Sequence, residues 1–186
     1  MFILHYYTLK NHNNKNRCPN PPITQKGSDR KTRNFFYNKA GLLEQFEFDR
    51  EQYITNINYN EKGQRTNIYF GNNSKTRYDY NPLNFRLTRL LTTRNTGQDI
   101  LQDLNYTYDP EGNIVQQTDK AQQDLYFGNE VIRPTGRYEY DALYRLTKAE
   151  GRELAGLNMP DNRDFSNEIL LPDSNSPQNY SHTYTY

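Results

Sequence analysis

One pattern recurs along the chain and limits its fold more than any other feature: two aromatic residues separated by one residue, then Asp or Asn, then a turn. Within residues 106–115, Tyr106 and Tyr108 alternate with a threonine, and all three positions carry residue types that favour β-strands. Residues 109–113 contain Asp, Pro, Gly and Asn, which favour tight turns. Residues 114 and 115 are Ile and Val, so a second strand follows. The pattern predicts a β-hairpin.

The pattern occurs five times, although the two earlier copies are weaker and Ile57 stands in place of the first aromatic residue in one of them, and a partial copy stands at residues 184–186. The second aromatic residue of the five copies is Tyr37, Tyr59, Tyr80, Tyr108 and Tyr140, at spacings of 22, 21, 28 and 32 residues. In the last of these copies the first aromatic residue is Tyr138. A period near 20 residues is typical of stacked arrays, because a single hairpin is marginal in water and gains stability from its neighbours. The sequence therefore predicts an all-β meander of short antiparallel hairpins.

The residue that follows each of these tyrosines is always Asp or Asn: Asn38, Asn60, Asn81, Asp109 and Asp141. Because Asn cannot serve as a general base, the interchange indicates acceptors of turn hydrogen bonds instead of catalytic carboxylates. Tyr108 and Tyr140 share one register, and we expect both to be substantially buried on strands, each followed by a turn. Gly112 is expected to have a positive φ, a conformation that residues with a Cβ rarely adopt.

The Tyr-Asp pairs at residues 108–109 and 140–141, together with longer stretches between them, carry a resemblance to a known family. These stretches lie at residues 76–78, 85–91, 101–110, 121–123 and 140–146. Over residues 35–186 the chain resembles Rhs repeats, also called YD repeats. It is most similar to the Rhs region of the B and C components of insecticidal toxin complexes (Tc toxins).

The resemblance implies a fold and a role. The expected fold is a curved sheet of YD-repeat hairpins that forms part of the wall of a hollow shell, or cocoon, around a toxic polypeptide before delivery. The expected partners are the other Rhs-repeat parts of the toxin and the enclosed toxic segment. Tc proteins of the C type resemble aspartic autoproteases in their Rhs-associated core. No stretch of this chain matches that core, so no catalytic aspartate is carried over and we expect a structural segment without enzymatic activity.

Composition supports a β fold and argues against a nucleic-acid-binding surface. The chain has 23 basic and 22 acidic residues, whereas nucleic-acid-binding domains show a basic excess. Its mean hydropathy is −1.13, yet 17 Tyr and 9 Phe supply apolar surface that disordered chains lack. The chain contains 24 Asn and 5 Ala, a bias that favours turns over helices.

We expect two regions. Residues 1–32 are polar, contain prolines and lack periodicity, so a disordered leader is predicted there. Residues 33–186 are the repeat region, which is expected to be truncated inside a repeat at Tyr186. Residues 119–137 are predicted to add a short hairpin. Residues 151–177 are predicted to form a long irregular excursion, with a helical turn at residues 151–154.

No constellation of residues predicts a catalytic, cofactor or metal site. His5, His12 and Cys18 fit no compact zinc pattern. The alternation of Tyr with Asn and Gln leaves a second function open, that of a cell-surface adhesion or glycan-binding module, although tyrosines that fill a thin sheet explain the same pattern. Neither a signal peptide nor a transmembrane segment is visible. The family implies a toxin complex that is cytoplasmic before release and then secreted or cell-associated.

Overall fold

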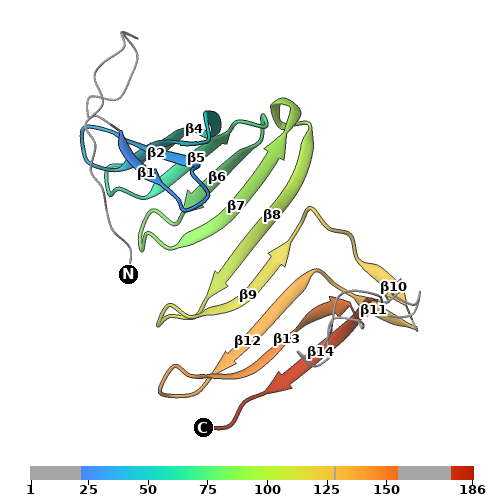
Figure 1. Cartoon of the computed structure of the whole chain (residues 1–186). Coiled ribbons are helices and arrows are strands. Elements are labelled where there is room, and N and C mark those ends of the chain that lie inside the picture. The colour runs from blue at the N-terminus through green and yellow to red at the C-terminus, as the bar shows by residue number, and fades with distance from the viewer. Residues whose placement is uncertain (1–21, 128, 155–176) are drawn as a thin grey trace. The chain divides into compact units, whose positions relative to one another are not determined.

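A computed structural model describes residues 22–127, 129–154 and 177–186, and almost all of them lie in β-strands or in the turns between strands (Figure 1). The one helical element among these residues is a single 3₁₀ turn, η1, at Asn95–Gly97. The predicted all-β class is therefore confirmed.

Fourteen strands are assigned in the described residues. Their bounds are β1 Ile23–Lys26, β2 Thr32–Tyr37, β3 Leu43–Phe48, β4 Glu51–Tyr59, β5 Arg65–Phe70, β6 Lys75–Tyr80, β7 Leu87–Arg94, β8 Asp99–Tyr108, β9 Ile114–Asp119, β10 Leu125–Phe127, β11 Glu130–Ile132, β12 Thr135–Tyr140, β13 Leu146–Leu154 and β14 Pro177–Thr183. The hydrogen-bonded order follows the sequence from β1 to β9 and continues with β12, β13 and β14. Strands β10 and β11 form a separate two-stranded sheet. The sequential antiparallel hairpins predicted from the repeat are confirmed.

The strands divide into two compact units, which we describe separately. The first unit comprises Met1–Asp79 and Leu91–Leu101, and the second comprises Tyr80–Leu90 and Gln102–Tyr186. In the first unit an unbroken row of directly paired apolar residues crosses five strands: Ile23, Phe35, Phe46, Ile54 and Phe70. The neighbouring row of Thr24, Asn34 and Glu47 is polar and internally hydrogen-bonded. Because side chains alternate across a strand, these two rows lie on opposite faces of the unit, and the face of the polar row also carries the buried Phe36, two residues from Asn34.

The second unit carries a longer polar row. Directly paired residues across β8, β9, β12, β13 and β14 form the row Thr107, Gln116, Arg137, Glu150 and Ser181, in which every member is polar. The opposite face carries Tyr106 and Tyr108 of β8 and Tyr138 and Tyr140 of β12. Among the described residues, the apolar side chains that are fully buried are Phe36, Ile57, Ile68, Ile132 and Ala149. The core is therefore thin, and half-buried tyrosines supply much of it.

Three predictions about the irregular regions can be compared with the structure. The short hairpin predicted within residues 119–137 is confirmed as β10 and β11. The helical turn predicted at residues 151–154 is wrong, because these residues continue β13 and pair with β14. The predicted leader, residues 1–32, is wrong at its end, because β1 pairs with β2 inside it. Residues 1–21 and 155–176, which include most of the predicted leader and excursion, lie outside the described residues.

Candidate functional site

The repeated unit is a hairpin loop closed by the residue that follows its tyrosine. The backbone N–H of Asn38, Asn60, Asp109 and Asp141 donates to the carbonyl oxygen four residues later, at 2.9 to 3.1 Å. In the fifth loop the N–H of Asn81 donates to Arg86, five residues later, at 2.8 Å. The strand register shifts immediately before Tyr37, Tyr59, Tyr108 and Tyr140, which marks a β-bulge at the same point of four hairpins.

Side-chain oxygens of the Asp and Asn residues hold these loops, as the sequence predicted. Asn38 Oδ1 accepts from the N–H groups of Ala40 and Leu42, both at 3.0 Å, and Asn60 Oδ1 accepts from those of Lys62 and Gln64, also at 3.0 Å. These contacts are Asx turns, in which the amide and the carboxylate serve equally well as acceptors.

Asp109 and Asp141 make additional bonds that use both carboxylate oxygens. Asp109 Oδ1 accepts from the N–H groups of Gly112 at 2.7 Å and Asn113 at 2.8 Å, and Oδ2 accepts from Asn113 Nδ2 at 2.7 Å. The Asn113 side chain, followed by these backbone N–H groups, lowers the pKa of Asp109. Asp141 Oδ2 pairs with the Arg145 guanidinium at 2.7 Å, and hydrogen bonds from Arg145 lower the pKa of Asp141. These carboxylates are ionised turn acceptors and lack the raised pKa of a general acid.

The residue before the last position of each loop has a positive φ. Three loops place glycine there, Gly41 at 77°, Gly63 at 74° and Gly112 at 113°, so the prediction for Gly112 is confirmed. A Cβ on Gly112 would also lie 2.7 Å from Arg86 Nη2. The other two loops place Phe85 at 60° and Tyr144 at 62° in this conformation, which favours glycine.

In three of the five copies the tyrosine before the loop ties its hairpin to the preceding one. Tyr108 Oη donates to the carbonyl of Leu87 at 2.7 Å, and Tyr140 Oη donates to that of Ile114 at 3.0 Å. Tyr59 Oη donates to the carbonyl of Leu43 in the same way. In each case the acceptor is the first residue of a return strand in the preceding repeat. We call these contacts the tyrosine clamps.

The tyrosine clamps explain the choice of Tyr over Phe at residues 59, 108 and 140, since Phe would fill the same space without the bond. Tyr108 and Tyr140 end β8 and β12 and are followed by turns, as predicted. Both side chains are half-buried. Burial raises the pKa of Tyr59, Tyr108 and Tyr140, so these hydroxyls remain protonated donors at neutral pH. Sequence reasoning missed the clamps, although the constant choice of Tyr over Phe was their signal.

Arg86 forms a second link between consecutive repeats in the second unit. Its Nη1 donates to the carbonyl of Asp109 at 2.9 Å and its Nη2 donates to that of Pro110 at 3.1 Å. The guanidinium also lies over the Tyr108 ring, 5.7 Å from the centroid. One arginine therefore holds the ring and the turn of the next hairpin.

A partly buried ion pair joins β7 and β8. Arg89 Nε and Nη2 donate to Asp103 Oδ1 and Oδ2 at 2.6 and 2.8 Å, a bidentate geometry. The Asp103 side chain is 8% exposed, and its pKa is lowered chiefly by the hydrogen bonds from Arg89. Asp103 is thus a structural carboxylate that no sequence pattern marks.

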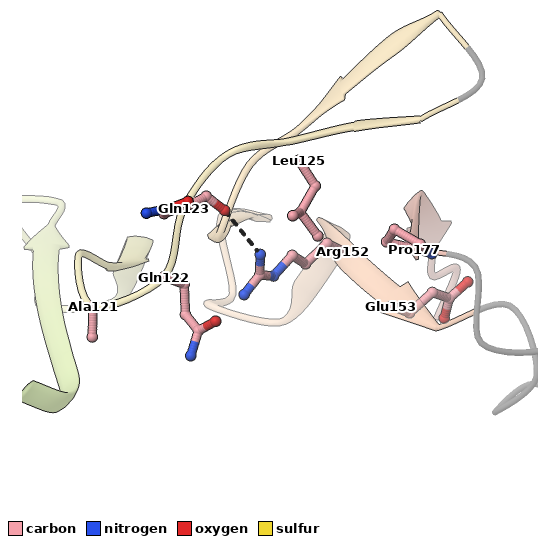
Figure 2. Close-up of a pocket in the computed structure, with 7 residues that line it drawn as sticks. All are labelled: Ala121, Gln122, Gln123, Leu125, Arg152, Glu153 and Pro177. Atoms are coloured by element: carbon pink, nitrogen blue, oxygen red, sulfur yellow. Dashed lines mark hydrogen bonds between the residues drawn. The ribbon is translucent and has the colours of Figure 1, made fainter.

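Two of the open hollows on the second unit border the loops and strands described above. One, of about 590 Å³, is bordered by the loops at residues 109–113 and 141–145, and its lining includes Tyr138, Tyr140 and Tyr144. The other, of about 650 Å³, lies beside the β10–β11 hairpin and is lined by Ala121, Gln122, Gln123, Leu125, Arg152, Glu153 and Pro177 (Figure 2). Within the described part of the chain, no group of three His, Cys, Asp or Glu residues could hold a metal ion. No helix in that part is long and apolar enough to span a membrane.

The structure places the predicted motif residues at equivalent positions, and four of them, Asp109, Tyr138, Tyr140 and Asp141, line one hollow. Tyr37, Tyr59 and Tyr80 are the last residues of β2, β4 and β6, and Asn81 begins a loop. Tyr106 and Tyr138 lie two residues before Tyr108 and Tyr140, on the same face of the second unit. Each motif acts within its own hairpin and on the adjacent one, which is the arrangement of a repeated structural element.

Comparison with known proteins supports the resemblance seen in the sequence. The chain is 37% identical to toxin subunit YenC2 of Yersinia entomophaga over 142 residues, which are 73% of this chain and 15% of YenC2. It is 33% identical to toxin subunit YenC1 of the same organism over 159 residues, which are 81% of this chain and 16% of YenC1. No family model matches the chain.

Solved structures of Tc toxins share the fold. A structure of the Photorhabdus luminescens Tc holotoxin pore matches with a TM-score of 0.69 and 32% identity, over 88% of this chain and 8% of that one. A crystal structure of TcdB2–TccC3 lacking its hypervariable C-terminal region matches with a TM-score of 0.70 at the same identity and coverage. The chain is thus homologous to the Rhs-type region of Tc toxin subunits, and it spans less than a fifth of the length of the relatives it matches.

Proposed function

We propose that this chain is a structural segment of a Tc-type toxin and forms part of the wall of the shell that encloses a toxic polypeptide before delivery. The observation that carries the proposal is the match to Tc toxin structures over 88% of the chain, at 32% identity and a TM-score of 0.69. Sequence identity at this level over the same residues supports a shared role for the segment as well as a shared fold.

The geometry of the repeats supports a structural role over a catalytic one. The carboxylates of Asp109 and Asp141 are occupied by their own loops, and Asp103 is occupied by Arg89. The tyrosine hydroxyls of the clamps are occupied by backbone carbonyls. Side chains that could perform chemistry are used here to hold one hairpin to the next, as a wall built from successive repeats requires.

The polar face of the second unit also suits a wall that must hold a polypeptide and later release it. In the second unit, the row from Thr107 to Ser181 offers hydroxyl, amide and charged groups and no apolar side chain. Such a surface gains little by binding the apolar segments of an enclosed, incompletely folded chain. We infer that this face is turned toward the enclosed polypeptide.

A chimera tests the proposal. The segment of YenC2 that matches this chain is replaced by the chain, and the chimera is assembled with the remaining subunits of that toxin. If the chain is a wall segment, the chimera assembles and protects the enclosed segment from an added protease as well as the parent toxin does. A chimera that expresses but leaves that segment open to the protease would contradict the proposal. A matched chimera with its repeats in shuffled order is the control, and it measures how fast the protease cleaves the enclosed segment when the wall is not formed.

The hollow lined by Tyr138, Tyr140 and Tyr144 favours one second candidate, a glycan-binding module. Aromatic rings can stack on sugar rings, and Glu111 and Asn113 in the same lining offer polar groups for hydroxyls. In a screen against immobilised neutral oligosaccharides, this candidate predicts binding that Tyr144→Ala abolishes. A screen without binding would leave the wall segment as the sole proposal.

A further inference from the structure

The contacts of Arg86 show how an arginine side chain binds a clamp tyrosine and the loop that follows it. Arg86 directly precedes Leu87, the residue whose carbonyl accepts the hydrogen bond of the clamp. Its guanidinium lies over the Tyr108 ring and donates to the first two carbonyls of the next loop. It lies so close to this loop that a Cβ on Gly112 would be 2.7 Å from Arg86 Nη2. Glycine therefore leaves room for the arginine.

The next clamp along the chain has no such arginine. Its acceptor is the carbonyl of Ile114, and the preceding residue is Asn113. Asn113 Nδ2 donates to Asp109 Oδ2 at 2.7 Å, so this side chain is used within its own turn. The loop of this clamp also differs, because Tyr144 stands at the position that Gly112 has in the other loop. A side chain fits there because no arginine lies against the loop.

A hollow of about 590 Å³ lies at this second clamp. Four of its lining residues are the repeat equivalents of Arg86 and of the three residues that Arg86 contacts: Asn113, Tyr140, Asp141 and Ala142. The Asp141 carbonyl accepts the N–H of Tyr144 at 2.9 Å, just as the Asp109 carbonyl accepts that of Gly112 at 3.2 Å. Figure 1 shows the turns after β8 and β12 at the same end of the second unit. The hollow thus presents the ring and the turn that Arg86 binds in the other repeat.

The charge of the hollow favours a cation. Its lining includes four acidic residues: Asp109, Glu111, Glu139 and Asp141. None of the described residues that line it is Lys, Arg or His. Arg145 pairs with Asp141 from outside the lining, and Lys148 lies 3.7 Å from Glu139. Glu111 forms no ion pair with any residue that the structure describes, so the lining keeps a negative charge.

We propose that this hollow binds an arginine side chain of another polypeptide, with the guanidinium over the Tyr140 ring and its N–H groups toward the carbonyls of Asp141 and Ala142. A guanidinium can stack on a tyrosine ring and donate several hydrogen bonds in one plane, which a compact ammonium group cannot do. The proposal does not depend on the role of the chain as a wall segment. It differs from the glycan candidate for the same hollow because it requires a positive charge on the ligand.

Binding of a short peptide tests this inference. The probe is a glycine peptide with one central arginine, and the control peptide carries citrulline, which has nearly the same shape without the charge. The full chain is tethered to a sensor surface at low density. It carries Arg17→Gln and Arg163→Gln, so that neither arginine outside the described residues can compete with the peptide. We expect the arginine peptide to bind about tenfold more tightly than the citrulline peptide, or more tightly still.

Substitutions in the hollow show whether the peptide binds there. Asn113→Arg places an arginine at the position equivalent to Arg86 and should abolish binding, whereas Asn113→Ala loses the same bond to Asp109 and should still bind. Glu111→Gln should weaken binding about threefold. Glu61→Gln removes an exposed carboxylate of the first unit and should leave binding unchanged. Equal binding of the two peptides, or binding that survives Asn113→Arg, would overturn the inference and leave the proposed function intact.

Discussion

Replacing Tyr108 with Phe removes one hydroxyl and leaves the ring in place, which isolates the contribution of a tyrosine clamp. In the structure Tyr108 Oη donates to the Leu87 carbonyl at 2.7 Å, and the tyrosine is half-buried. A hydrogen bond of this type contributes about 1 kcal/mol net, and leaving a partly buried acceptor unpaired raises the loss to about 1–2 kcal/mol. The substitution should therefore weaken the link between two consecutive hairpins without altering either hairpin's own turn.

Hydrogen exchange read by mass spectrometry measures this effect locally. In the YenC2 chimera, a loss of about 1–2 kcal/mol would speed exchange at the paired amides of β7, β8 and β9 by a factor of about 5 to 30. Tyr126→Phe is the control, because that side chain is 80% exposed and belongs to no clamp. Tyr59→Phe and Tyr140→Phe should act as Tyr108→Phe does, each at its own hairpin.

The same hydroxyl gives a pH dependence. Burial raises the pKa of Tyr108, so the stability contributed by its neutral form is complete below the unfolded pKa of about 10 and is lost as the pH rises through the folded pKa. Exchange in the parent should therefore quicken relative to Tyr108→Phe above about pH 10. If Tyr108→Phe and Tyr126→Phe exchange at the same rate at pH 7, the clamp contributes nothing measurable and the reasoning is refuted.

Other substitutions test the turns and the ion pair. Gly112→Val should destabilise its hairpin by about 1 kcal/mol or more, because φ is positive at Gly112. Tyr144→Gly should be neutral or stabilising, because φ is positive at Tyr144 as well. Equal effects of the two substitutions on local hydrogen exchange would argue against the loop assignment. Asp109→Asn should be tolerated and Asp109→Ala should speed exchange in the loop, since Asn38 and Asn60 perform the same function; identical rates for the two variants would count against the Asx turn. Arg89 lowers the pKa of Asp103, so the stability contributed by this ion pair is complete above the unfolded pKa of about 3.9 and is lost as the pH falls through the folded pKa. The parent should therefore lose local stability below about pH 4, and Asp103→Asn should lose less. Parallel pH profiles of the parent and the variant would contradict this.

The strands and turns within each repeat could be predicted from the sequence. Alternating aromatic residues and the Asp or Asn after them predicted strands and turns, and the positive φ of Gly112 followed from the turn. The hydrogen bonds between repeats could not be predicted, because they join residues such as Tyr140 and Ile114 that lie 26 positions apart. The spacing between repeats varies, so no fixed separation marks such a pair in the sequence. The constant choice of Tyr over Phe was the only trace that the links left.

Two errors had physical causes as well. Strand β1 was assigned to a leader because Ile23–Lys26 is short and polar, yet pairing with β2 gives it hydrogen bonds that its composition does not reveal. Residues 151–154 appeared helical because Arg, Glu and Leu are good helix formers, but pairing along β14 overrides that local preference. In both places tertiary pairing determined the structure.

The behaviour of the chain by itself tests the central claim most directly. Strands β1 and β14 are the outer strands of the hydrogen-bonded order, so each offers an edge that can pair with another chain, and a single cysteine excludes an internal disulfide that could compensate. Light scattering on the purified chain is the measurement. A wall segment should oligomerise or aggregate when isolated and should gain solubility when the rest of a Tc subunit surrounds it, as in the chimera. A monodisperse monomer with a single cooperative melting transition would show that the chain closes its own edges, and it would contradict the assignment as a piece of a larger wall.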